Sequence, residues 1–170
     1  PVIAHANREG ANLFTASIVA LDVDTGKMAW YFQASPHDTH DWDATQTPVL
    51  IDDTVNGRPR KLIAQASRNG KYFLLDRTNG KFLTAKPYVR QTWNAGFDEN
   101  GRPKFTPNSN ATPEGNVVYP SLVGGTNWQA PSYDASSNVL YLMYAESGNR
   151  FVRSEMAYEP GKGYWGGRTF

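Results

Sequence analysis

The chain has 170 residues, a formal net charge of +1 and no cysteine. This length suffices for one domain with a buried core. The small net charge, and aromatic residues that are not interleaved with basic clusters, argue against a nucleic-acid partner or an anionic membrane. The lack of cysteine excludes thiol catalysis, thiolate metal sites and disulfides. Gly, Pro, Trp and Tyr are frequent, and this mix favours short strands joined by turns.

The two ends of the sequence indicate a piece of a longer protein. Residues 1–5 lack the basic head and apolar centre of a signal peptide, and the chain does not begin with Met. No apolar run approaches the roughly 18 residues of a membrane span. The last eight residues read like the interior of a longer sequence. We therefore expect one partial domain over residues 1–170, incomplete at both ends.

The first predicted hairpin follows this unusual start. Residues 16–21 alternate small and branched apolar side chains, as strands do. Residues 22–26 supply turn chemistry, with Gly26 free to adopt a positive φ, and residues 27–32 return as a second strand. A polar turn is also predicted over residues 52–60, between strands at 49–51 and 61–64.

The same hairpin pattern recurs further along the chain. Residues 71–76 and 81–83 flank a turn that Asp76 opens and Gly80 closes, as Asp22 and Gly26 do in the first copy. A looser third copy spans residues 131–144. A hairpin that repeats at about 50 residues is typical of propeller blades. We therefore predict an all-β fold, with residues 94–120 as one long loop that is functional or packed over an opening.

An acidic stretch, SPHDTHDWDATQ (residues 35–46), precedes the predicted strand at 49–51. If it is extended, Asp41 and Asp43 point to one side, while His40 and Trp42 point to the other. Two readings stay open, a solvated polar corner or a pair of hard oxygen ligands for a cation. The histidines match no familiar zinc spacing, so we expect them to be hydrogen-bonded structural residues.

Two later turns carry further candidates. Arg68, in the Ser-Arg-Asn-Gly turn, either reaches solvent or is held at a cleft to bind an oxygen or an anion. Asn127, in Gly-Gly-Thr-Asn-Trp, either holds a ligand or caps its turn, and we expect Trp128 to pack within a blade. That segment lacks the Gly-Lys-Ser/Thr of a phosphate-binding loop, and no Gly-x-Ser-x-Gly elbow supports serine hydrolysis.

Three segments together resemble one family. NLFTASIVALDVDTGKMAWYFQASPHDTHDWD, RPRKLIAQASRNGKYFLLDRTNGKFL and SLVGGTNWQAPSYDASSNVLYLMYAE are similar, in order and spacing, to the pyrroloquinoline-quinone (PQQ) dependent alcohol dehydrogenases, the quinoprotein methanol and ethanol dehydrogenases. The resemblance runs from about Arg8 to Met143. It implies an eight-bladed β-propeller of four-stranded blades, of which this chain covers about three.

The resemblance also implies roles for single residues. Asp41 falls on the family's catalytic carboxylate, Arg68 on the basic residue that contacts the quinone, and Asn127 on a PQQ contact. Asp43 matches the second Asp of lanthanide-dependent members, where calcium-dependent members carry a non-acidic residue. An additional carboxylate is attracted more strongly to a trivalent ion than to a divalent ion. We therefore expect Asp41 and Asp43 to be metal ligands for a lanthanide or calcium ion, and Asp38 to be structural.

The chain departs from the family pattern at several places. His40 replaces the Trp that usually precedes the catalytic Asp, and Ala11 stands where many members have Asp. The family's earlier metal ligands, a Glu and an Asn, have no counterpart here, and neither has the Trp that stacks on the quinone. The segment alone is therefore not expected to enclose PQQ or to be active.

The activity implied by the resemblance is oxidation of an alcohol to an aldehyde. The cation would polarise the C5 carbonyl of PQQ, Asp41 would take the hydroxyl proton, and hydride would pass to C5. The implied partners are an alcohol, a cytochrome c that accepts electrons and the remainder of the propeller, and a homodimer is also compatible; the implied location is the periplasm. Two alternatives stay open, a non-catalytic propeller that serves as a scaffold or assembly factor, and another soluble quinoprotein such as a sugar dehydrogenase.

Overall fold

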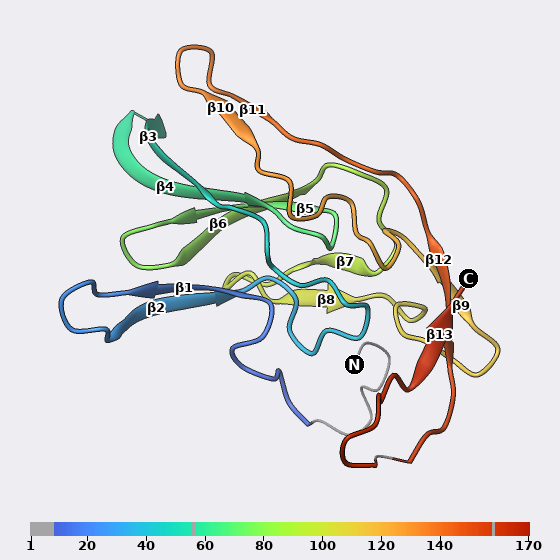
Figure 1. Cartoon of the computed structure of the whole chain (residues 1–170). Helices are drawn as coiled ribbons and strands as arrows, with labels where there is room; N and C mark the ends of the chain where they lie inside the picture. The colour runs from blue at the N-terminus through green and yellow to red at the C-terminus, as the bar shows by residue number, and fades with distance from the viewer. Residues whose placement is uncertain (1–8, 56, 158) are drawn as a thin grey trace.

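The computed structural model describes residues 9–55, 57–157 and 159–170. Residues 1–5, which lack the sequence features of a signal peptide, lie outside these ranges. Within these ranges every regular element is a strand, which confirms the all-β prediction (Figure 1). No helix in this part of the chain has the length and apolar character to cross a membrane. The strands are β1 (Ser17–Leu21), β2 (Met28–Gln33), β3 (Val49–Val55), β4 (Arg58–Ala66), β5 (Lys71–Asp76), β6 (Lys81–Pro87), β7 (Asn94–Phe97), β8 (Pro103–Phe105), β9 (Asn116–Val118), β10 (Ser132–Asp134), β11 (Val139–Tyr141), β12 (Asn149–Arg153) and β13 (Gly167–Thr169).

Strands β3 to β6 form one antiparallel sheet in chain order, the one four-stranded sheet among the described residues. Side chains of β5 alternate between its faces, so that Phe73 and Leu75 enter one apolar cluster and Tyr72 and Leu74 another. Strands β3 and β4 extend further into the polar segment than predicted, since Asp52 lies opposite Lys61 and Asp53 opposite Arg60. Opposite charges across an antiparallel pair favour the strand, and the sequence pattern alone had suggested a turn.

The second predicted hairpin is β5–β6 of this central sheet, and the first and third form the separate sheets β1–β2 and β10–β11 beside it (Figure 1). Hairpin β1–β2 packs Phe32 and Trp30 against one face of β3–β6, and the Trp30 indole donates a hydrogen bond to the Arg77 carbonyl at 3.0 Å. Tyr133 of β10 packs against the opposite face, next to Leu62. Each blade-like hairpin is therefore held by the sheet that follows or precedes it in the chain.

The repeated turn has the same geometry in all three copies. The carboxylates of Asp22, Asp76 and Asp134 each accept a backbone N–H two or three residues further on, at 2.8, 3.0 and 2.9 Å. The turns close at positive φ on Gly26 (67°), Gly80 (72°) and Asn138 (59°). Asn is one of the few residues other than Gly that adopts this conformation readily, which explains why the third copy looked looser in sequence.

The prediction of one long loop over residues 94–120 is wrong. This segment contains β7 and β8, which pair with each other, and β9, which pairs with β12. Strands of three or four residues are too short to show periodicity, and β9 pairs with residues distant in sequence, so neither had a local signal. Trp93 and Val118 from this region join Trp42 and Phe151 in a buried cluster. Trp42 belongs to the acidic stretch, so the stretch contributes to this cluster.

Candidate functional site

The acidic stretch between β2 and β3 is irregular, so the extended conformation considered for it from the sequence is not the one it adopts. His37 and Asp41 adopt positive φ values of 50° and 65°. The side chains nevertheless separate as predicted: His40 and Trp42 are buried, while Asp43 is exposed and Asp41 is half-buried. The buried side chains of His40 and Trp42 therefore anchor the backbone, while the two carboxylates remain accessible to solvent.

Asp38 provides much of that fixation. Its Oδ1 accepts the backbone N–H of His40 at 3.0 Å, and its Oδ2 accepts that of Trp42 at 2.6 Å. The side chain is only 12 % exposed. Burial raises the pKa of Asp38 to about 7, even though both hydrogen bonds favour the ionised form. These contacts agree with the structural role expected for Asp38.

The rings of His40 and Trp42 anchor the stretch to distant parts of the chain. They stack at a centroid distance of 4.1 Å and an interplanar angle of 11°. His40 Nε2 lies 2.6 Å from the Ser109 carbonyl oxygen, and Trp42 Nε1 donates to the Ser121 carbonyl at 3.0 Å. His37 Nδ1 likewise lies 2.7 Å from the Gly10 carbonyl oxygen. The prediction of hydrogen-bonded structural histidines is confirmed.

Arg68 is held inside the molecule, so the alternative in which it reaches solvent is wrong. It is 8 % exposed and lies in the turn between β4 and β5. Its Nη2 donates to the Leu122 carbonyl at 2.7 Å, and its Nη1 lies 3.5 Å from Asp43 Oδ2. Its Nε is buried and has no hydrogen-bond partner among the described residues.

The Gly-Gly segment packs against the backbone of Arg68. The Gly125 N–H donates to the Arg68 carbonyl at 2.9 Å. A Cβ placed on Gly124 would lie 2.7 Å from the Arg68 Cβ and 2.8 Å from its carbonyl oxygen. Only glycine fits at this position. Because Ser121 and Leu122 hold Trp42 and Arg68 through consecutive carbonyls, one loop joins the acidic stretch to the Arg68 turn.

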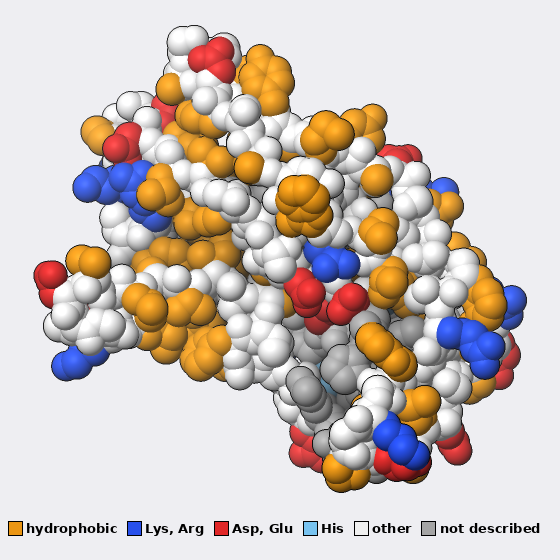
Figure 2. All heavy atoms as spheres, viewed as in Figure 1, with side chains coloured by type: hydrophobic (Ala, Val, Ile, Leu, Met, Phe, Trp, Pro, Cys, Tyr) orange, Lys and Arg blue, Asp and Glu red, His pale blue; other side chains and the backbone are white. Residues whose placement is uncertain are grey.

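Two carboxylates and one guanidinium share this place. Burial raises the pKa of Asp41, the charge of Asp43 raises it further, and the charge of Arg68 partly offsets both effects. Asp43 is 59 % exposed, so its ion pair with Arg68 is open to water on one side. Figure 2 shows acidic side chains directly against a basic one near the middle of the face in view. The formal charge of the trio is negative, which favours a cation.

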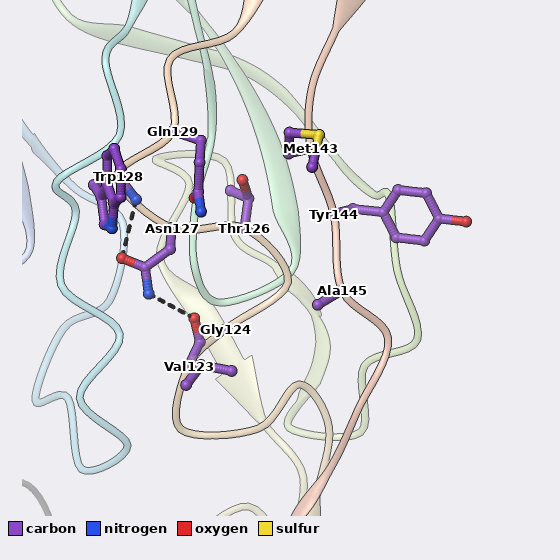
Figure 3. Close-up of a pocket in the computed structure, with 9 residues that line it drawn as sticks. All are labelled: Val123, Gly124, Thr126, Asn127, Trp128, Gln129, Met143, Tyr144 and Ala145. Atoms are coloured by element: carbon purple, nitrogen blue, oxygen red, sulfur yellow. Dashed lines mark hydrogen bonds between the residues drawn. The ribbon is translucent and has the colours of Figure 1, made fainter.

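Asn127 lies on the same loop, a few residues beyond the part that contacts Arg68. Its amide donates to the Val123 carbonyl at 3.0 Å, and its Oδ1 accepts the Trp128 N–H at 2.9 Å (Figure 3). It lines an open pocket of about 340 Å³ together with Gly124 and Met143. Its amide makes no hydrogen bond to Asp41, Asp43 or Arg68 within the described part of the chain. The structure therefore pairs Asp43 with Arg68 directly, places Asp41 within electrostatic range of both, and connects Asn127 to Arg68 only through the loop.

Two residues differ from what the sequence suggested. Trp128, expected to pack within a blade, is 74 % exposed at the rim of the pocket, because its segment belongs to no strand that would direct it inward. Gln46 was not singled out, yet it is buried and its Oε1 accepts the backbone N–H of Arg68 at 3.3 Å. No local pattern could reveal this contact, since the two residues come from different strand connections.

Comparison with known proteins agrees with the fold and the segments described above. Residues 3–87 match the model of the family described as "PQQ: Glucose/ethanol/alcohol dehydrogenase, beta-propeller domain". The chain belongs to this family. This match confirms both the family resemblance and the propeller fold that the sequence predicted.

Individual members of the PQQ propeller family show the same similarity. The 1-butanol dehydrogenase (cytochrome c) of Thauera butanivorans is 42% identical over 132 residues, which cover 78% of this chain and 19% of that protein. The quinohemoprotein alcohol dehydrogenase structure from Comamonas testosteroni matches with a TM-score of 0.84 at 37% identity, over 89% of this chain and 23% of that one. A europium-containing methanol dehydrogenase matches with a TM-score of 0.90 at 28% identity, over 99% of this chain and 30% of that one. The chain thus spans less than a third of each of these proteins.

The residues present fit part of a site for a quinone and a hard cation. Carboxylate oxygens such as those of Asp41 and Asp43 are ligands that calcium and similar ions prefer. The unpartnered Nε of Arg68 is a buried donor that lacks an acceptor, which a quinone oxygen would supply. Two carboxylates are fewer oxygens than such an ion takes, and the described residues contain no group of three or more acidic or histidine side chains suited to a metal. A complete ligand set for such an ion would need oxygens beyond those of Asp41 and Asp43.

Proposed function

We propose that this chain forms part of a PQQ-dependent alcohol dehydrogenase and contributes the catalytic base and part of the cofactor site. The observation that carries the proposal is the cluster of Asp41, Asp43 and Arg68, positioned by the loop that also bears Asn127. These residues fall where the family motifs imply a base, a metal ligand and two cofactor contacts. The names of the relatives, which are alcohol dehydrogenases, support the same reaction class.

Asp41 is the proposed general base. Its half-buried carboxylate has a raised pKa, and a base works best when its pKa approaches the operating pH. It would remove the hydroxyl proton of the alcohol while the substrate carbon is oxidised. When bound, PQQ supplies the acceptor for the two electrons, and a cation supplies Lewis acidity.

Arg68 and Asn127 are the proposed cofactor contacts. The guanidinium is held by the Leu122 carbonyl, and its buried Nε–H has no acceptor among the described residues, so it can bind an oxygen that gains negative charge. The Asn127 amide lies beside an open pocket, where it would orient the cofactor from the neighbouring loop.

Asp41 and Asp43 are the proposed metal ligands, and we propose a lanthanide or calcium ion between them. The second carboxylate supports the trivalent ion, and the match to a europium-containing methanol dehydrogenase supports the same choice. We further propose that the remaining ligands lie in other parts of a complete propeller, that electrons pass to a cytochrome c, and that the enzyme works in the periplasm. The names of the quinohemoprotein and cytochrome c relatives support the electron acceptor.

Titration of the complete protein with PQQ tests the proposal against a scaffold role. Wild-type protein should acquire the absorbance of bound quinone at one equivalent. Arg68→Met should weaken binding by about tenfold or more, because it removes a charged hydrogen-bond donor from a buried position. Arg77→Met, which removes an arginine paired with Asp52 elsewhere, should bind as wild type. A wild-type protein that takes up no quinone would support a scaffold instead.

A further inference from the structure

The backbone of Asp41 is in a conformation that an aspartate does not adopt by default. Its φ of 65° belongs to the left-handed region, where the Cβ of an L-residue crowds the following carbonyl. Aspartate enters this region more readily than most residues, but the conformation is still uncommon, and contacts of the neighbouring residues help to maintain it. The contacts of the residues on both sides of Asp41 are therefore relevant to its conformation.

Asp38 does this with one carboxylate. Its two oxygens bind the N–H groups of His40 and Trp42, the residues that flank Asp41 in the chain. The carboxylate thus closes a small ring of backbone around the proposed base. Charge-assisted hydrogen bonds of this kind are stronger than those between neutral groups.

The flanking rings complete the restraint. His40 and Trp42 stack on each other, and His40 also contacts the ring of Phe151 edge-on at 4.9 Å. Their outer ring nitrogens meet the carbonyls of Ser109 and Ser121, which lie in two different segments. Asp41 itself is half-buried, and its carboxylate lies within electrostatic range of Asp43 and Arg68.

We propose that Asp38 is a positioning residue, which clamps the backbone on both sides of Asp41 and so sets the direction of its carboxylate. The inference rests on the proposed role of Asp41 as the base. Asp38 does not touch the reacting atoms; it acts by preventing the Asp41 backbone from relaxing to a negative φ. A base displaced by about 1 Å loses about a hundredfold in rate.

Asp38→Ala and Asp38→Asn in the complete, cofactor-loaded enzyme test the proposal. Asp38→Ala should lower kcat by about a hundredfold, with quinone binding and the alcohol KM within about twofold of wild type. Asp38→Asn keeps the volume and one acceptor oxygen but replaces the other oxygen with an N–H₂ group, so it should lose less. If Asp38→Ala does not fold, the kcat of Asp38→Asn tests the positioning role instead.

Asp76→Ala is the matched control. Asp76 is also a buried carboxylate that accepts a backbone N–H two residues further on, but it caps the β5–β6 turn and pairs with Arg60. It should lower stability without lowering kcat. Hydrogen exchange gives a second readout: in Asp38→Ala the amides of His40 and Trp42 should exchange at least about tenfold faster, while residues 71–87 stay unchanged.

The outcomes separate the two proposals. Wild-type protein that oxidises no alcohol would contradict the proposed function. An active wild type whose two Asp38 variants keep its kcat, or lose no more than Asp76→Ala at equal loss of stability, would overturn the positioning role.

Discussion

At the scale of single residues, the site is a balance of three charges. Asp43 faces the guanidinium of Arg68 at 3.5 Å, and Asp41 lies within the field of both. One guanidinium cannot neutralise two carboxylates, so this place attracts a further positive charge. A cation bound there would draw Asp43 into its ligand set and leave Arg68 free to contact an anionic oxygen.

The role of Asp43 as a metal ligand can be measured by calorimetry with calcium and with a light lanthanide. We expect the wild-type protein to prefer the lanthanide, and Asp43→Ala to lose about tenfold or more of that affinity. Asp52→Ala is the control, since Asp52 is also an exposed carboxylate paired with an arginine, at 2.8 Å from Arg77. If Asp43→Ala bound each ion with the same affinity as wild type, the metal role of Asp43 would be ruled out.

Some of these residue contacts could be predicted from the sequence, and some could not. Alternation in the acidic stretch placed Asp41 and Asp43 on one side, although the backbone that achieves this is not a strand. The burial of Arg68 depends on Leu122, and that of Trp42 on Ser121, so both depend on a loop more than 50 residues away. Contacts of that kind leave no periodic signal in a single sequence.

At the scale of elements, the repeated hairpin was the part of the fold most visible in the sequence. Its signal is local, because an Asp that caps the turn and a residue at positive φ that closes it lie a few positions apart. Strands β7, β8, β9, β12 and β13 were missed, since each is five residues or fewer, and β9 in addition pairs with β12, about 30 residues further along the chain.

The closing glycines of the two hairpins are equivalent in conformation but not in surroundings. An added Cβ at Gly80 would lie 2.6 Å from the Trp30 ring, whereas one at Gly26 would meet nothing within 4 Å. We expect Gly26→Ala to lower the free energy of unfolding by about 1 kcal/mol, from backbone strain alone. Gly80→Ala adds a clash in the core and should cost about 3 kcal/mol or more. Urea unfolding measures both; equal losses would mean that Trp30 yields freely and does not fix the two sheets together.

At the scale of the whole molecule, the sheets are arranged as neighbouring blades. The central sheet is covered on both faces, but the outer faces of hairpins β1–β2 and β10–β11 expose large apolar side chains, among them Val19, Tyr31, Val139 and Tyr141. Figure 2 shows hydrophobic side chains gathered over this part of the molecule. These faces support the proposal that further blades of a complete propeller pack against them, and that such a propeller brings the missing metal ligands to Asp41 and Asp43.

The most direct test of the account is alcohol turnover by the complete protein loaded with PQQ and with calcium or a lanthanide, comparing wild type with Asp41→Asn. The substitution keeps the shape of the side chain and removes its ability to take a proton. Wild type should oxidise a primary alcohol, and Asp41→Asn should lose at least about a hundredfold to a thousandfold in kcat while the absorbance of bound quinone remains. Turnover at the wild-type rate by Asp41→Asn would contradict the assignment of Asp41 as the base.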